Sequence, residues 1–238
     1  MPSALTIDDF KAFSATCELR YKHGYLIFDR TGHVMEDMRE SFPDIALSTA
    51  SPQQTLFTAE EGTFAIELAA CRFTSGHLDK NGETFAKHCK TFFDIVTDQF
   101  QIAVFTRIGL RNIFRREYKT EDESKQALAS MMLANLKPTK RFNSSDSPTE
   151  VLFRWEDAQI GATVRLKAET TEIKLNVPAE LQESVPKVDK KSIGLTLDID
   201  YYTVAPVERE QWDAQEWLPQ KFRIIKKEVD SILQGGAK

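Results

Sequence analysis

The sequence has few of the residues and motifs that mark metal or catalytic centres. Its three cysteines, Cys17, Cys71 and Cys89, form no CxxC pair and leave one thiol over in any disulfide scheme. Its four histidines show no HExxH or paired zinc spacing, and there is no GxSxG elbow, P-loop or GxGxxG loop. We therefore expect no cofactor and no bound metal. The cysteine usage favours a reduced, cytoplasmic setting.

Long hydrophobic runs are also missing. No stretch approaches the roughly 20 apolar residues that a membrane span needs. The first residues, MPSALTIDDFKAF, contain no basic segment followed by an apolar one. The formal charge is −5, so the molecule as a whole has no field that would attract nucleic acid or an anionic membrane. We expect no membrane partner, and any anion site must be local.

What the chain does contain is the composition of a globular protein, with 41% hydrophobic residues, 28% charged residues and 16 phenylalanines. We predict an α+β fold, with a largely antiparallel, twisted sheet and helices packed on one side; two loosely similar halves are the alternative arrangement. This length can form one core, so a single domain over residues 1–238 is expected. The Pro-, Ser- and Asn-rich stretch 137–148 is the best sub-boundary or exposed loop.

Local patterns predict the individual elements. Helices are expected over 6–13, over 82–100 after an N-cap at Asn81, over 34–41, from a capping box of Thr120 and Glu123 to about residue 136, and over 219–233. Strands are expected over 18–29, 54–59, 63–73, 101–118, 151–155, 162–168, 172–177 and 194–204. The segments on either side of Thr170 are predicted to form a hairpin.

One strand carries the most distinctive local pattern. In QIAVFTRIGLRNIFRREY, Arg107, Arg111 and Arg115 fall on one face because side chains alternate sides along a strand. Phe105 is expected on the same face. A row of guanidinium groups can hold phosphates or carboxylates bidentately, and Gly109 would let a ligand approach the backbone. Cations interleaved with aromatic rings are also typical of proteins that bind single-stranded nucleic acid, and Tyr118 follows just beyond the arginines.

A second interpretation of this face needs no ligand. Asp198 and Asp200 of LTLDIDYY also share one face of a strand, and on a neighbouring strand they would neutralise the arginines. Two carboxylates at this spacing can share a divalent cation. The sequence offers no third ligand, so ion pairs or solvent exposure are the favoured role.

RIGLRNIF, GLTLDIDYY and the closing amphipathic helix resemble a sporadically distributed family of uncharacterised bacterial proteins of similar length. In that family, a strand of the type R-x-G-x-R follows a phenylalanine-rich helix. The corresponding residues here are Arg107, Gly109 and Arg111, which follow Phe92, Phe93 and Phe100. The resemblance implies a bacterial, cytosolic α+β protein and brings no activity or catalytic residues with it.

Three functional hypotheses follow. The leading one is a non-enzymatic binding or interaction module, in which Arg107, Arg111, Arg115 and Phe105 receive an anionic group of a partner protein, a nucleotide or a nucleic acid. The second is an enzyme acting on a phosphorylated small molecule, with Asp198 or Asp200 as metal ligand or base. The third is a structural homo-oligomer assembled through a strand edge or helix face.

Overall fold

The computed structural model describes residues 5–22, 25–51, 53–79, 81–132, 149–174 and 189–234. The strands are β1 (Lys11–Tyr21), β2 (Ala46–Ala50), β3 (Gln54–Ala59), β4 (Gly62–Glu67), β5 (Ala70–Ser75), β6 (Val104–Glu117), β7 (Glu150–Glu156), β8 (Ile160–Lys174), β9 (Asp189–Thr203) and β10 (Val207–Glu208). The α-helices are α1 (Ile27–Ser41), α2 (Glu83–Phe100), α3 (Glu121–Met132) and α4 (Ala214–Leu233), and short 3-10 turns lie at η1 (Ile7–Asp9) and η4 (Arg209–Gln211).

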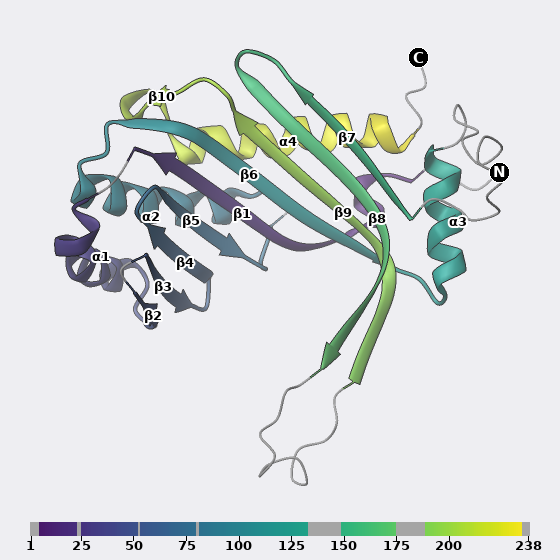
Figure 1. Ribbon diagram of the computed structural model, residues 1–238, viewed down its shortest axis with the longest axis horizontal. Helices are drawn as coiled ribbons and strands as arrows, with labels where there is room; N and C mark the ends of the chain where they lie inside the picture. Colours follow the sequence, from purple (N-terminus) through teal and green to yellow (C-terminus); the bar gives the residue numbers. More distant parts are fainter. Residues whose placement is uncertain are drawn as a thin grey trace, which may run out of the picture.

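The described strands form one antiparallel sheet. Their order is β2-β3-β4-β5-β1-β6-β9-β8-β7, with β10 also paired to β6. In Figure 1 the long central strands cross the molecule, and α2 and α4 run behind them. The predicted α+β class with a largely antiparallel sheet is confirmed.

The core lies between this sheet and the helices. Aromatic pairs join α2 to β4 and β5, with Phe92 5.2 Å from Phe64 and Phe85 5.3 Å from Phe73 between ring centroids. Trp217 of α4 contacts Tyr201 of β9, with 6.2 Å between the ring centroids. The stripe predicted for α2 is buried throughout: Phe85, Cys89, Phe92, Val96 and Phe100. This burial confirms the predicted helix and its apolar face.

The first 30 residues differ from the prediction. The helix expected over 6–13 is reduced to the single turn η1, and β1 begins at Lys11. The strand expected over 18–29 ends at Tyr21, and α1 begins at Ile27. The period-two burial that starts at Ala15 places this segment in the sheet, and it prevails over a spacing of apolar residues that also suits a helix.

Two hairpins also differ from the prediction. The strand expected over 63–73 is divided into β4 and β5 by a turn. Conversely, no turn occurs near Thr170, because β8 continues to Lys174 and pairs with β9 along its whole length. The segment around Thr170 contains no Gly, Pro or Asn to favour a turn, and threonine suits a strand that has a partner. β8 and β9 therefore project beyond the body as a two-stranded ribbon (Figure 1).

Helix α3 begins as predicted. The Glu123 amide donates to the Thr120 hydroxyl at 3.1 Å, and the Glu123 carboxylate accepts from the Lys119 amide at 3.1 Å. The loop and sub-boundary expected at 137–148 lie outside the described residues. In the part of the chain that the structure describes, no helix combines the length and apolar character needed to cross a bilayer.

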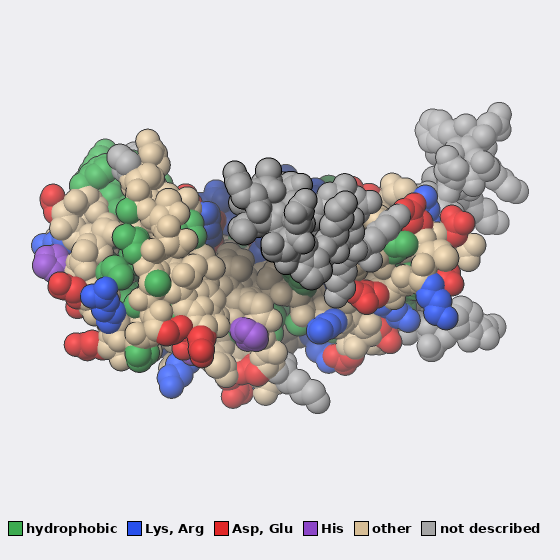
Figure 2. All heavy atoms as spheres, turned by 90° about the horizontal axis from the view of Figure 1, so that it is seen from below, with side chains coloured by type: hydrophobic (Ala, Val, Ile, Leu, Met, Phe, Trp, Pro, Cys, Tyr) green, Lys and Arg blue, Asp and Glu red, His purple; other side chains and the backbone are tan. Residues whose placement is uncertain are grey.

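One end of the molecule exposes several large hydrophobic side chains. They gather where α1 and β2 lie (Figure 2) and include Tyr25, Phe28 and Leu47. β2 forms one edge of the described sheet and is exposed along its whole length, and β7 forms the other edge. These are the surfaces on which the homo-oligomer hypothesis would depend, and that hypothesis stays a prediction.

The N-terminus of α2 is capped by a residue other than the predicted Asn81. The Asp79 carboxylate accepts the amide hydrogens of Glu83 at 2.9 Å and Thr84 at 2.8 Å, and Gly82 turns the chain at a φ of 68°. Desolvation opposes ionisation of Asp79, but these hydrogen bonds outweigh it and hold the pKa of the carboxyl below its usual value.

We expect Asp79→Ala to lower the free energy of unfolding by about 1 kcal/mol near neutral pH, the usual effect of losing such a cap. Because the folded-state pKa is depressed, the carboxylate stabilises the fold above its ordinary pKa of 3.8, and this contribution is lost as the pH falls through the folded-state value. Urea denaturation at a series of pH values measures it. Asn81→Ala is the control, and a difference from wild type that does not change with pH would contradict the charged cap.

Candidate functional site

A groove of about 500 Å³ crosses β5, β1, β6, β9 and β8. It lies on the sheet face opposite the core, because its residues alternate with buried ones along each of the three central strands. Its lining is polar apart from Gly109 and consists of five arginines, three carboxylates and three threonines: Arg20, Arg72, Arg107, Arg111, Arg165, Glu18, Asp198, Asp200, Thr16, Thr74 and Thr163. We call this the arginine groove.

Arg107 is the central side chain of the arginine groove. Its guanidinium folds along its own strand over Gly109, where a Cβ atom would lie 2.8 Å from Arg107 Nη1. Nη1 donates to Glu18 Oε1 of β1 at 3.3 Å, and Nη2 donates to the two Asp200 oxygens of β9 at 2.9 and 3.2 Å. The guanidinium carbon also lies 4.4 Å from the centre of the Tyr202 ring. Gly109 therefore makes room for the Arg107 guanidinium, and the predicted approach of a ligand at Gly109 stays a prediction.

Arg111 forms a bidentate pair with Asp198. Nε and Nη2 each donate to one Asp198 oxygen at 2.8 Å, and this pairing raises the pKa of Arg111. The Arg111 side chain remains 53% exposed, compared with 21% for Arg107. Its Nη1 makes no hydrogen bond with the described residues. The structure thus pairs Arg107 and Arg111 with Asp200 and Asp198, as the interpretation without a ligand predicts. Arg111 nevertheless remains open to solvent.

Asp200 is a partly buried carboxylate of the groove. Burial raises the pKa of the Asp200 carboxyl above its usual value, although Arg107 and Arg111 act in the opposite direction. Repulsion from Asp198 and Glu18 adds to the effect of burial. Asp200 therefore takes up a proton more readily than an exposed aspartate.

The other three arginines also have carboxylate partners, but their side chains are more exposed than that of Arg107. Arg20 Nε donates to Glu18 at 2.6 Å, and Arg72 lies 2.8 Å from a Glu67 oxygen. Arg165 lies 3.2 Å from a Glu150 oxygen. Exposed pairs of this kind contribute about 0–1 kcal/mol each to stability. Their guanidinium groups can therefore turn toward a ligand at little cost.

The structure places Phe105 in the core, contrary to the prediction. Phe105 is 1% exposed, and its ring meets Trp212 edge-on at 5.5 Å between centroids. Arg20 of β1 pairs with Arg107, but the next β1 residue pairs with Phe105, so Thr106 is an extra residue in β6. Such a bulge reverses the alternation of side chains.

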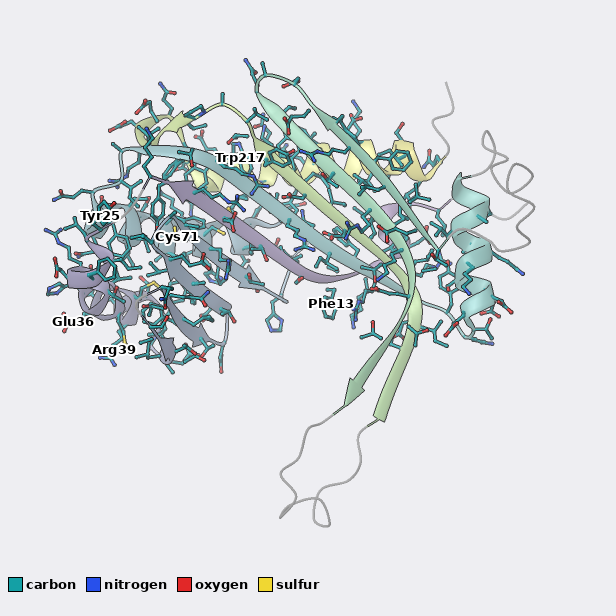
Figure 3. All side chains as sticks on the ribbon, in the orientation of Figure 1. Phe13, Tyr25, Glu36, Arg39, Cys71 and Trp217 are labelled. Atoms are coloured by element: carbon teal, nitrogen blue, oxygen red, sulfur yellow. The ribbon has the colours of Figure 1, made fainter. Side chains whose placement is uncertain are left out.

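Arg115 also lies apart from the arginine groove. Its guanidinium carbon is 4.2 Å from the centre of the Phe13 ring, and Nη2 donates to Thr171 of β8 at 3.4 Å. Figure 3 shows Phe13 near the base of the projecting β8–β9 ribbon. The structure therefore brings together only Arg107 and Arg111 of the four predicted binding residues.

Sequence reasoning missed the groove residues that come from β1, β5 and β8. Glu18 and Arg20 were assigned to a strand, but their partners were not foreseen. The signal for β1 was present in ATCELRY, where Thr16, Glu18 and Arg20 alternate with the buried Cys17 and Leu19. Arg72 of β5 and Arg165 of β8 likewise lie on the face of their strands that points away from the core. Only the strand order shows that they share a surface with the β1 residues.

Other candidate chemistry is not assembled. Within the described residues, no group of three or more His, Cys, Asp or Glu side chains is arranged to hold a metal ion. The three cysteines are free and buried. Burial raises the pKa of both Cys71 and Cys89, so these thiols stay protonated and are poor nucleophiles.

Comparison with known proteins gives no family assignment. No protein-family model and no curated protein matches the chain. The functional argument therefore rests on the arginine groove itself.

We expect Gly109→Ala to push the Arg107 guanidinium away from Asp200, because the new methyl group would occupy its place. Loss of this cation raises the Asp200 pKa further, since Arg107 is the largest influence that lowers it. A carboxyl-carbon NMR titration of Asp200 measures the change. Gly76→Ala, whose Cβ would meet only the Phe13 carbonyl at an ordinary 3.6 Å, is the matched control. An unchanged Asp200 titration would show that Arg107 does not depend on Gly109.

Proposed function

We propose that this protein is a binding module whose arginine groove receives an anionic group. The proposal rests on one observation, the convergence of five arginines from four strands on a groove that only three carboxylates line. The chain as a whole carries −5, so attraction for an anion must come from these arginines, two of which also pair with Glu67 and Glu150 beside the groove. Arginine suits such a role because its planar fork of donors matches phosphate and carboxylate oxygens.

The internal carboxylates support binding by holding the arginines in place. Asp198 engages one side of the Arg111 guanidinium and leaves Nη1 without a partner among the described residues. Asp200 and Glu18 fix Arg107 from two neighbouring strands. A donor that is already ordered loses less side-chain entropy on binding than a mobile one. In this proposal Arg107 joins the strands beneath the ligand, and the ligand is contacted by the other four arginines of the groove, Arg20, Arg72, Arg111 and Arg165.

Pyrophosphate is a suitable probe, and we expect Arg111→Ala to weaken its binding by about tenfold or more. A hydrogen bond to a charged group contributes about 1.5–3 kcal/mol, and each 1.4 kcal/mol changes affinity tenfold. Isothermal titration calorimetry across a salt series measures it, and the salt dependence should weaken in the variant as one charge contact is lost.

Arg39→Ala is the charge-matched control for this experiment. Arg39 lies on α1 at the far end of the molecule (Figure 3) and does not line the groove. Thermal melts of both variants test for an effect on the fold. If the two variants bind pyrophosphate equally well, the arginine groove is not the anion site.

A second candidate function is an enzyme that acts on a phosphorylated small molecule. It is favoured by the position of Asp200, a carboxylate with a raised pKa, in the same groove as the arginines. In this reading the arginines orient the phosphate and Asp200 serves as base or acid.

The enzyme hypothesis predicts that Asp200→Asn abolishes turnover but still binds pyrophosphate. Phosphorus NMR of a mixture of sugar phosphates incubated with the protein would detect turnover by wild type. If wild type leaves every compound in the mixture unchanged, the hypothesis fails for this substrate class, and the binding proposal is unaffected.

A further inference from the structure

The lining of the arginine groove restricts the kind of ligand that it can hold. Apart from Gly109, every lining residue is Arg, Thr, Asp or Glu. Small-molecule pockets are usually apolar with a few polar groups, and protein interfaces depend on buried aromatic or aliphatic anchors. A peptide or an apolar compound would find no such anchor here. The ligand must be held by hydrogen bonds and charge alone.

The groove also offers no ring for stacking. Tyr202 contacts Arg107 but is not among the lining residues. Its ring is covered by the Arg107 guanidinium on one side and packs closely over Gly161. Nucleotides and single-stranded nucleic acids gain much of their affinity from base stacking on aromatic rings. Their bases would have nothing to stack on in this groove.

The arginines form two groups that lie on different strands. Arg20 and Arg72 flank Glu18 on β1 and β5. Arg111 and Arg165 flank Asp198, since Arg111 is paired with it and Arg165 stands opposite it across β8 and β9. Glu18 stands opposite Gly109, and Gly109 stands opposite Tyr202, which is four residues along β9 from Asp198. Two strand spacings across the sheet and four residues along it place the Glu18 and Asp198 backbones roughly 16 Å apart. A single phosphate cannot contact both groups.

Hydroxyl and carboxylate groups occupy the space between the two arginine groups. One row of the sheet register runs from Thr74 through Thr16, Arg111 and Asp200 to Thr163. Threonine hydroxyls both donate and accept hydrogen bonds, and a carboxylate accepts them from ligand hydroxyls. A chain of phosphates would meet repulsion from Asp200 at this point. A chain of hydroxyl groups would be complementary to the same residues.

We propose that the arginine groove binds a phosphorylated polyol with an anionic group at each end, such as a sugar bisphosphate. Arg20 and Arg72 hold one phosphate, Arg111 and Arg165 hold the other, and the threonines and Asp200 bind the hydroxyl groups between them. This inference rests on the proposed anion-binding function and specifies its ligand class. It explains why a groove for an anion contains carboxylates as well as arginines.

The test uses fructose 1,6-bisphosphate as the probe, with fructose 6-phosphate, pyrophosphate and ADP for comparison, all by isothermal titration calorimetry. We expect the bisphosphate to bind about tenfold or more tightly than each of the other three. Arg20→Ala and Arg165→Ala each remove a phosphate contact from one end, so each should reduce bisphosphate affinity to about the level of fructose 6-phosphate. Arg39→Ala should leave it unchanged, and melts of each variant check the fold.

The outcomes separate this inference from the proposed function. If pyrophosphate binds in an Arg111-dependent way but the bisphosphate binds no more tightly, the polyol inference is wrong and the anion site stands. Tighter binding of ADP would also overturn the inference, since it would require a base contact. If none of the four compounds binds, both the inference and the proposed function fail.

Discussion

Burial of one face of the central sheet beneath α2 and α4 is the constraint on which the rest of the structure depends. Side chains alternate along each strand, so a core residue of β1, β6 or β9 places its neighbours on the opposite face wherever no bulge interrupts the register. In β9, Leu197, Ile199 and Tyr201 are buried, and this places Asp198 and Asp200 opposite the core. The same two-residue period therefore forms both the core and the arginine groove, because the groove residues alternate with the buried ones along each strand.

Charge compensation then decides how those residues are arranged. Arg107 bridges β1, β6 and β9 through Glu18 and Asp200, and it is the least exposed arginine among the ion pairs of the groove. Arg111 has a single partner and faces solvent. The same face thus contains Arg107, which joins three strands, and Arg111, which keeps one guanidinium nitrogen without a hydrogen bond to the described residues. The position of each arginine relative to the carboxylates decides which of these roles it has.

The sequence was sufficient where a signal was local and regular. The buried stripe of α2 and the α3 capping box could be predicted, because each depends on a short local pattern. The sequence also offered Asp198 and Asp200 as partners of the arginines, and the structure pairs them with Arg107 and Arg111 but not with Arg115. Glu18, Arg72 and Arg165 could not be placed together, because their proximity depends on strand order. Phe105 was misplaced because a one-residue bulge leaves no mark in composition. Asn112 is fully buried, and neither of its amide atoms has a hydrogen-bond partner in the described structure, a polar intrusion that no amphipathic pattern foretells.

The bulge at Thr106 has a consequence for how this protein can change during evolution. It divides β6 into two segments, and different contacts decide which face the side chains of each segment occupy. On one side, Phe105 is held in the core by Trp212. On the other, Arg107 and Arg111 keep their phase through their pairs with β9. Substitutions on the arginine face need not disturb the contact between Phe105 and Trp212, so the charged face and the aromatic packing can change separately within a single strand.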